Sequence, residues 1–367
     1  MRVLHLIPSF QGGGAERQLS YLAPALAQLG VETLVAHHMD GPNLSRLLGS
    51  DVLLHRLNVR SNYDPHLLFG VVQLVRRYRP HVIQSWLTQM DLIAAAVQLV
   101  TPALWILSER NSADAYPPTW KNWLRARAAL SADAIIANSR KGVEYWESLG
   151  YSGHTAVVRN AIQMSRYETE PGLKDPSLPD SYVLFAGRLA SQKNLEAVID
   201  AFAIVAHRNP TTLILAGEGP LDTDVRQRIS DRGIADRVML LGYVNDLPRL
   251  MRTASVFVSL SHYEGNPNTV LEACALGVPL VVSDIPEHRE FLTEASARLV
   301  PTSDPSVAAE AILSVLEQRP EVAARAAAAK AVVTELTVEA SALGYIEVYK
   351  RLLHAPGRRG ASIRPTV

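Results

Sequence analysis

The feature that most constrains this chain is a repeated alternation between short apolar runs and longer stretches with helical periodicity. In the first half, the apolar runs of strand length are residues 3–7, 31–36, 52–57, 82–84, 105–107, 134–137 and 156–158. Between the first two runs, Leu19, Leu22 and Leu26 recur at helical spacing before Gly30, which is typical of a helix end. Such alternation predicts a mainly parallel sheet with helices on both faces.

One stretch interrupts this rhythm. Residues 166–181 contain Pro171, Gly172, Pro176 and Pro179 among charged residues, a composition typical of a linker between domains. Further strand runs then follow, again separated by helical stretches, at residues 182–186, 213–216, 238–241, 256–259, 280–283 and 298–300. The sequence therefore predicts two domains, each with its own sheet and core.

The predicted fold class is α/β, with two Rossmann-like parallel-sheet domains, residues 1–165 and 182–340, that face a central cleft. A cleft of this kind is where ligands bind in such folds. A helical pattern at residues 341–355 is expected to cross back to the first domain. Residues 356–367 are expected to form a flexible basic tail.

Charge and cysteine usage exclude some classes of function. The formal net charge is +0, so nothing points to nucleic acid as a partner. The single cysteine, Cys274, lies in an apolar run, which predicts a buried thiol and a reducing compartment. The N-terminus lacks the pattern of a signal peptide, and the apolar stretch 92–107 is short for a membrane span and contains Pro102. We therefore expect a cytoplasmic protein.

A motif with the letters EGNPNTVLEA follows the strand run 256–259. Asn266 is a preferred N-cap residue and Pro267 a preferred first helical residue, so a helix is expected to begin here. The free N–H groups of a helix start suit a diphosphate, and Gly265 lets a ligand approach the backbone. Glu264 and Glu272 frame the motif, but such a pair alone is more often a loop acid and a surface acid without a ligand.

Cations follow a second strand run. Gly187 and Arg188 come directly after residues 182–186, and Lys193 lies in the same loop. A guanidinium binds phosphate oxygens through its planar fork and an ammonium adds a point charge. The pattern therefore favours a phosphate site over a solvated basic loop. A glycine-rich turn at residues 217–220 follows a third strand run and is weak evidence by itself.

Taken in order, these motifs resemble the retaining glycosyltransferases of the GT-B fold, glycosyltransferase family 4, also called group 1 glycosyltransferases. The resemblance rests on Gly187-Arg188 with Lys193, on the turn at 217–220, and on EGNPNTVLEA with the letters ALGVP at 275–279. The glycine loop at residues 12–14, followed by Ala-Glu, fits the start of the family's N-terminal domain. The resemblance covers about residues 1–350.

The resemblance implies a role for each motif. Arg188 and Lys193 would bind the donor diphosphate and stabilise the departing nucleoside diphosphate, and Glu264 would contact the donor sugar; these are the implied catalytic residues. Glu272 would bind the ribose, and Tyr243 would lie near the base. The implied donor-binding residues are, in full, Gly13, Gly14, Gly187, Arg188, Lys193, Gly217, Gly219, Tyr243, Glu264, Gly265, Asn266, Pro267, Asn268, Thr269 and Glu272.

The family transfers sugars with retention of anomeric configuration and without a bound metal ion. Cations and helix N–H groups at the leaving phosphate stabilise the charge that develops there, so no cofactor or metal is expected, and the nucleotide-sugar is a substrate. A D-x-D pattern, the metal motif of a different transferase fold, does occur at Asp222-Thr223-Asp224. It opens a helical stretch, so helix capping is the favoured interpretation.

One departure from the family concerns the first domain. Many relatives carry a histidine after a late strand there, facing the donor sugar, whereas this chain has Ser108-Glu109-Arg110-Asn111. Glu109, Arg110 or Asn111 is expected to take that place on the acceptor side, together with Asn160. The identity of a catalytic base stays open.

The acceptor is less constrained by the sequence. The stretch Trp120-Lys121 with Trp123, Arg125 and Arg127, and the arginines at 76, 77 and 79, mix aromatic or apolar residues with cations. They fit a helix surface that rests on an anionic membrane and equally a solvated helix edge with tryptophans in the core. A peripheral location on the inner face of the membrane follows from the first interpretation.

The function we predict is transfer of a hexose or N-acetylhexosamine from a nucleotide-sugar, UDP-linked rather than GDP-linked, to a saccharide or polyprenyl-linked acceptor in cell-surface polysaccharide synthesis. The alternatives are a non-catalytic nucleotide-sugar-binding subunit and a nucleotide-sugar epimerase. A dinucleotide oxidoreductase is disfavoured because the first strand is not followed by G-x-G-x-x-G.

Overall fold

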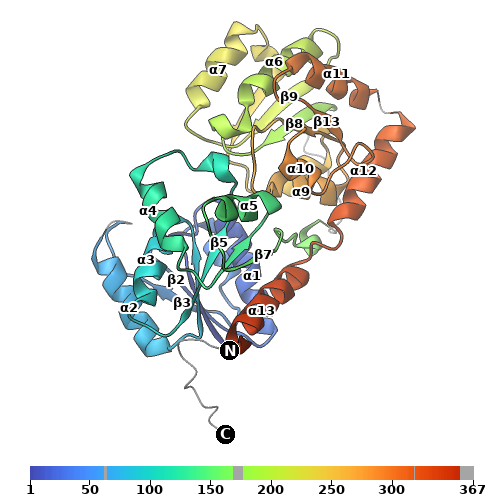
Figure 1. Cartoon of the computed structure of the whole chain (residues 1–367). Coiled ribbons are helices and arrows are strands. Elements are labelled where there is room, and N and C mark those ends of the chain that lie inside the picture. The colour runs from blue at the N-terminus through green and yellow to red at the C-terminus, as the bar shows by residue number, and fades with distance from the viewer. Residues whose placement is uncertain (62–63, 168–176, 318, 356–367) are drawn as a thin grey trace. The chain divides into compact units, whose positions relative to one another are not determined.

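A computed structural model describes residues 1–61, 64–167, 177–317 and 319–355 of the chain. Contacts divide it into two compact units, one made of residues 1–161 with the C-terminal segment from Leu336, the other of residues 162–335 (Figure 1). These divisions differ by a few residues from the predicted boundaries at 165 and 340. Most of the predicted linker and the whole predicted tail lie outside the described residues.

The first unit is built on a seven-stranded sheet, as far as the chain is described, with the order β3-β2-β1-β4-β5-β6-β7. All neighbouring strands pair in parallel. The strands are β1 (Arg2–Leu6), β2 (Glu32–His37), β3 (Leu53–Arg56), β4 (Val82–Trp86), β5 (Leu104–Glu109), β6 (Ala134–Ala137) and β7 (His154–Val157). Each coincides with a predicted run to within a few residues, which confirms the β-α alternation.

The helices of this unit are α1 (Gly14–Gln28), α2 (His66–Tyr78), α3 (Thr88–Gln98), α4 (Trp120–Ala129), α5 (Arg140–Ser148) and α13 (Val338–His354). They cover both faces because β1 alternates its side chains: Val3 joins a core with α1 and α13, whereas Leu4 joins a core with α2, α3 and α5. Tyr345 and Tyr349 of α13 are fully buried in the first of these cores. The predicted return of the C-terminal helix to the first domain is confirmed, and α13 lies beside α1 (Figure 1).

The second unit has a six-stranded sheet, within its described residues, with the order β10-β9-β8-β11-β12-β13. Its strands are β8 (Tyr182–Ala186), β9 (Thr212–Ala216), β10 (Val238–Gly242), β11 (Val256–Ser259), β12 (Leu280–Ser283) and β13 (Arg298–Val300), all parallel. Its helices are α6 (Leu195–Ala206), α7 (Asp222–Asp231), α8 (Leu247–Arg252), α9 (Asn268–Leu276), α10 (Pro286–Arg289), α11 (Pro305–Leu316) and α12 (Pro320–Val333). Cys274 on α9 is buried and free, as predicted.

Strand order fixes where each unit can bind a ligand. In both sheets the chain starts in the middle, builds outward to one edge, and then returns to build the other half. The order reverses between β1 and β4 in the first unit and between β8 and β11 in the second. Loops leave such a switch point in opposite directions and open a crevice at the carboxyl ends of the strands. A ligand site is therefore expected at the loops after these four strands.

Candidate functional site

At the switch point of the second unit, the loops after β8 and β11 are joined by side-chain contacts. Lys193 Nζ lies 2.5 Å from Glu264 Oε1. Gln192 Nε2 donates to the other carboxylate oxygen of Glu264 at 3.3 Å and to the carbonyl of Tyr263 at 2.9 Å. Glu264 is buried, so its carboxylate is held in one orientation by two donors from the neighbouring loop.

The loop after β9 packs against the loop after β8 without room for a side chain. Gly217 has a φ of +145°, and a Cβ atom there would lie 1.9 Å from the Gly187 carbonyl oxygen. Its N–H donates to the Gly242 carbonyl at 2.7 Å, which ties in the end of β10. Gly219 faces the Leu189 carbonyl in the same close way. Glycine at 217 is therefore required for the loop that carries Arg188 to keep its position.

The two cations predicted at this site differ in their surroundings. Arg188 is exposed, and within the described residues its guanidinium has no hydrogen-bond or ion-pair partner. Lys193, in contrast, is already paired with Glu264 and is largely covered. Arg188 is thus available to an anion that arrives from solvent, whereas Lys193 also orients a carboxylate.

The helix of the EGNPN motif begins later than predicted. Pro267 is extended, with φ −75° and ψ 97°, and acts as the N-cap of α9, which starts at Asn268. The Pro267 carbonyl accepts the first helical hydrogen bond, from Leu271 N at 3.1 Å. The predictions of Asn266 as N-cap and Pro267 as first helical residue are wrong, because the proline's ψ keeps it outside the helix. The amides of Asn268 and Thr269 belong to the first turn, where N–H groups lack helical partners.

The other residues predicted to bind the nucleotide-sugar are found on α9 and after β10. Glu272 is buried on α9. Tyr243 follows β10 with an exposed ring, and its N–H donates to Glu218 Oε1 at 3.3 Å.

The predicted capping role of the D-x-D pattern is wrong, because α7 begins at Asp222 without a side-chain cap and Asp222 pairs with Arg226 at 2.8 Å. Among the described residues, no cluster of three or more His, Cys, Asp or Glu is arranged to hold a metal ion.

Two residues near this site were missed by the motif analysis. Gln192 sits inside the cation motif, and only its contacts with the loop after β11 reveal its role. His288 on α10 is fully buried and lies near enough to Glu264 and Lys193 to sense their charges. Burial lowers the pKa of His288, so its ring is neutral at pH 7.

In the first unit, the glycine loop after β1 is closed by a glutamate. Gly13 is the N-cap of α1 and Gly14 its first residue. The Glu16 side chain folds back so that a Cβ atom on Gly13 would lie 2.0 Å from its carboxylate oxygen. Ser9 Oγ donates to Glu16 Oε1 at 3.1 Å, and burial raises the pKa of this carboxyl group. A side chain at position 13 would therefore require the Glu16 carboxylate to move.

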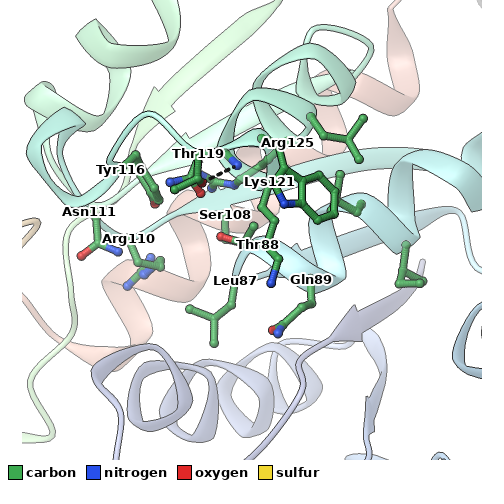
Figure 2. Close-up of a pocket in the computed structure, with 15 residues that line it drawn as sticks. Leu87, Thr88, Gln89, Ser108, Arg110, Asn111, Tyr116, Thr119, Lys121 and Arg125 are labelled. Carbon is green, nitrogen blue, oxygen red and sulfur yellow. Dashed lines mark hydrogen bonds between the residues drawn. The ribbon is translucent and has the colours of Figure 1, made fainter. Parts of the chain in front are cut away.

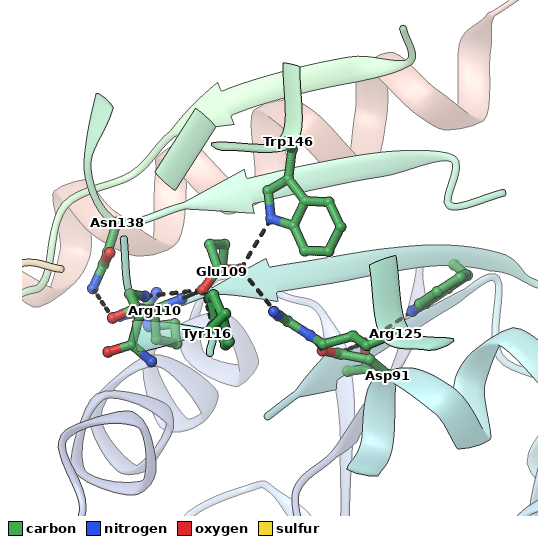
Figure 3. A network of polar contacts seen from close by, with 10 residues as sticks. Asp91, Glu109, Arg110, Tyr116, Arg125, Asn138 and Trp146 are labelled. Atoms are coloured by element: carbon green, nitrogen blue, oxygen red, sulfur yellow. Dashed lines mark hydrogen bonds and ion pairs between the residues drawn. The ribbon is translucent and has the colours of Figure 1, made fainter. Parts of the chain in front are cut away.

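The loop after β5 is organised by Glu109, which is fully buried (Figure 3). Its Oε1 accepts hydrogen bonds from Arg110 N at 2.8 Å, Asn111 N at 2.9 Å and Tyr116 OH at 2.5 Å. Its Oε2 accepts from Arg125 Nη2 at 3.0 Å and Trp146 Nε1 at 2.9 Å. A carboxylate with this many donors holds the loop in shape and keeps no face toward solvent. Sequence reasoning named Glu109 but could not show these partners.

Arg125 is the second charge of this network. Its Nε donates to Asp91 Oδ2 at 2.7 Å, and its side chain is only 2% exposed. Burial by itself would lower the pKa of Arg125, but the charges of Glu109 and Asp91 raise it well above its usual value. Arg125 was grouped with cations that could face a membrane; that prediction is wrong, because this residue neutralises two buried carboxylates.

Arg110 is held from three sides. Its guanidinium lies over the Trp86 ring, 5.0 Å from the centroid. Nη1 donates to the Tyr345 hydroxyl of α13 at 3.1 Å, and Nη2 donates to Asn160 Oδ1. The structure thus brings Asn160, predicted on the acceptor side, into contact with Arg110. Arg110 follows the carboxyl end of β5, which pairs with β4, one of the two strands at the switch point of this sheet.

A pocket of about 530 Å³ opens between α3, α4 and the loop after β5 (Figure 2). This volume is in the range of small-molecule sites. Leu92 and Ile93 of α3 and Trp120 of α4 contribute apolar surface, and Arg110 and Asn111 contribute polar groups. Arg110 and Asn111 thus belong to a pocket wall, whereas Glu109 lies behind it.

The exposed tryptophans of α4 bear on the interpretation that placed them in the core. Trp120 and Trp123 on α4 are 69% and 65% exposed, so they do not lie in the core. Across the part of the chain that the structure describes, no helix combines the length and apolar character of a membrane span.

Family models match both halves of the chain. The model for "Glycosyl transferases group 1" matches residues 174–332, and the model for "Glycosyltransferase Family 4" matches residues 12–166. The chain belongs to the group 1, family 4 glycosyltransferases. The two predicted domains of this glycosyltransferase correspond to the two matched segments.

Individual relatives agree with this family. The lipopolysaccharide core biosynthesis mannosyltransferase LpsB of Rhizobium meliloti is 27% identical over 64% of this chain and 69% of its own length. The GDP-mannose:cellobiosyl-diphosphopolyprenol alpha-mannosyltransferase of Xanthomonas campestris is 27% identical over 65% of this chain and 63% of its own length. The match therefore spans just under two thirds of the second relative.

A solved structure agrees with the fold. The crystal structure of Anabaena HepE in complex with UDP-glucose superposes with a TM-score of 0.83 at 22% identity, covering 95% of this chain and 99% of that one. This glycosyltransferase thus has the GT-B fold class that the motif order predicted.

Proposed function

We propose that this enzyme transfers a hexose or N-acetylhexosamine from a nucleotide-sugar, UDP-linked in preference to GDP-linked, to a saccharide or lipid-linked acceptor. We further propose that the anomeric configuration is retained and that the product belongs to cell-surface polysaccharide synthesis. The observation that carries this proposal is the contact between Lys193 and Glu264 at the switch point of the second unit, beside the exposed Arg188.

The chemistry of transfer gives these groups distinct tasks. The bond between the anomeric carbon and the diphosphate must break, and negative charge builds up on the leaving phosphate. Arg188, Lys193 and the first N–H groups of α9 are the donors proposed to stabilise that charge. Glu264, oriented by Lys193 and Gln192, is proposed to accept hydrogen bonds from hydroxyl groups of the sugar. Glu272 is proposed to bind the ribose, and Tyr243 to contact the base. No bound metal is required in this scheme.

The relatives support the proposed nucleotide and the proposed class of acceptor. HepE has been crystallised with UDP-glucose, whereas the Xanthomonas relative is named for GDP-mannose, so GDP is the alternative that a test must exclude. The Rhizobium relative is named for lipopolysaccharide core synthesis and the Xanthomonas relative for a diphosphopolyprenol acceptor. Both names support an acceptor that belongs to cell-surface glycan assembly.

Nucleotide binding tests the donor site directly. The purified enzyme would be melted with UDP, GDP and dTDP, alone and as the Arg188→Ala and Glu272→Gln variants. A ligand that binds only the folded state raises the melting temperature. UDP is expected to stabilise the native enzyme more than GDP, and both variants are expected to lose most of this effect. Arg226→Ala, an exposed arginine on α7, is the matched control and should respond like the native enzyme.

Turnover separates the enzyme from the alternatives. Release of nucleoside diphosphate from UDP-sugars should occur only when an extract that contains saccharide or lipid-linked acceptors is added. NMR of the product then gives its anomeric configuration. Conversion of the donor without an acceptor would support an epimerase instead. Normal nucleotide binding without turnover on any acceptor would support a non-catalytic binding subunit.

A further inference from the structure

The pocket between α3 and α4 is lined by two chemically different kinds of side chain. Apolar side chains come mainly from the helices: Leu92 and Ile93 from α3, Leu124 and Trp120 from α4, and Leu87 just before α3. A sugar can place only its C–H faces on such a wall, because its hydroxyl groups need polar partners, whereas a hydrocarbon chain is stabilised by all the apolar area that it buries.

Two cations among the lining residues supply positive charge. They are Arg110 and Lys121, and none of the described lining residues is acidic. Arg125 also lines the pocket, but it is ion-paired with the buried carboxylates of Asp91 and Glu109 and adds no net positive charge. Arg110 is fixed by Trp86 and Tyr345, so little side-chain freedom is lost when an anion binds to it. The charge of these two cations suits a phosphate or diphosphate.

Exposed aromatic residues lie on α4, which lines the pocket, and on α2, which packs against α3. In a parallel sheet each helix begins at the carboxyl edge, so the first turns of α2 and α4 lie at the same edge, with α3 packed between the two helices. Phe69 in the first turn of α2 is 63% exposed, and Trp120 and Trp123 begin α4. Exposed aromatic residues beside cations are typical of surfaces that rest at a membrane interface.

We propose that this pocket binds the phosphate-bearing head of a lipid-linked acceptor, with the phosphates at Arg110 and Lys121 and the first lipid units along Leu92, Ile93 and Trp120. The inference rests on the proposed function, since it assigns the acceptor class of the same reaction. It favours a lipid-linked acceptor over a free saccharide, because a hydrocarbon chain would bury more of the apolar wall.

Farnesyl diphosphate, a short isoprenoid diphosphate, is the probe, and inorganic diphosphate is its counterpart without lipid. Binding to the full-length enzyme would be measured by calorimetry below the concentration at which the probe forms micelles. Trp120→Ser and Lys121→Ala remove one apolar and one cationic residue from the lining of the pocket. Trp123→Ser and Arg127→Ala are matched controls, because these residues are exposed on the same helix but do not line the pocket. All four positions are exposed, so the variants are expected to fold, and their melting temperatures would verify this.

The native enzyme is expected to bind farnesyl diphosphate, with affinity reduced about tenfold or more in Trp120→Ser and Lys121→Ala and within about threefold of native in the two controls. Equal loss in controls and pocket variants, equal affinity for inorganic diphosphate, or no binding at all would overturn the inference. UDP and GDP binding, measured on the same samples, keeps the two proposals apart. Nucleotide binding without farnesyl diphosphate binding rejects only the lipid pocket, whereas absent nucleotide binding rejects the donor site.

Discussion

Lys193 Nζ and Glu264 Oε1 lie 2.5 Å apart, although the residues are 71 positions apart in the chain. Parallel pairing of β8 with β11 brings their loops together at the switch point of the second sheet. Glu264 is 5% exposed, and its carboxylate is held in position by Lys193 and Gln192. The pair therefore fixes the orientation of the Glu264 carboxylate, which we propose faces the donor sugar, while the exposed Arg188 is proposed to bind a phosphate.

Replacing either partner should affect different steps. Glu264→Gln keeps the size and one acceptor of the side chain, so UDP affinity is expected to stay within about threefold while turnover falls on the order of 10²-fold. Lys193→Met removes the cation from both the phosphate and the carboxylate, so UDP affinity and turnover should fall together. Calorimetry with UDP and a nucleotide-release assay measure the two effects. Equal behaviour of the two variants would contradict the separate tasks.

Gly217→Ala should disable the donor site through the backbone. Its added Cβ would lie 1.9 Å from the Gly187 carbonyl, so the loop that carries Arg188 must move. A loss of about 2–4 kcal/mol in the free energy of unfolding is expected, with loss of UDP binding. Gly233→Ala is the matched control, because Gly233 also has a positive φ of +66° but has no atom within 4 Å of the added Cβ. That variant should cost about 1 kcal/mol and bind UDP normally.

The spacing of the apolar residues, together with the positions of glycine and proline, was sufficient to predict the two parallel sheets. Strand runs such as 182–186 and 256–259 were placed correctly because buried parallel strands are continuously apolar, and the motifs then had to lie at their carboxyl ends. Local preference was less reliable at helix starts. Pro267 has the expected φ, but its ψ depends on packing around the loop, so α9 begins at Asn268. Neighbouring residues alone do not determine that angle.

The first-unit network could not be predicted because its members are distant in sequence. Glu109 finds its partners on α4, on α5 and in the following loop, and only the folded sheet brings them together. Arg125 reads as a surface cation in a basic helix, yet the fold places it between Asp91 and Glu109. For the same reason the pocket between α3 and α4 has no sequence signature.

Glu109→Gln tests whether this residue is structural or chemical. The amide would place an N–H₂ group against donors such as Arg125 or Tyr116, so the free energy of unfolding should fall by about 3–5 kcal/mol. Urea unfolding followed by tryptophan fluorescence measures this, because all 5 tryptophans lie in the first unit. Trp146→Phe, which removes one donor and keeps an aromatic ring, should cost about 1–2 kcal/mol. A stable Glu109→Gln enzyme without turnover would instead identify Glu109 as a catalytic base.

The stability of the first unit should depend on pH through His5. This ring is fully buried on β1, and its Nδ1 accepts a hydrogen bond from Trp86 Nε1 at 3.2 Å. Its Nε2 has no hydrogen-bond partner among the described residues. Burial lowers the pKa of His5 to about 3, against about 6.5 in an unfolded chain. Below pH 6.5 His5 binds a proton in the unfolded state but not in the folded state. The contribution of His5 to the free energy of unfolding is therefore fully present above pH 6.5 and decreases as the pH falls toward 3.

The expected size of this effect is about 1.4 kcal/mol per pH unit, or about 2 kcal/mol between pH 6.5 and pH 5. Glu16 and Asp91 have pKa values raised by burial and act in the opposite direction, so the slope of the native protein alone does not isolate the histidine. The His5→Gln variant does, because glutamine does not titrate and its side-chain oxygen can still accept from Trp86. Urea unfolding by tryptophan fluorescence at pH 7.5, 6 and 5 should give a variant that is less stable at neutral pH but loses about 2 kcal/mol less on acidification. Parallel curves for the two proteins would mean that His5 is protonated in the folded state, and that the space around its Nε2 admits water or an anion.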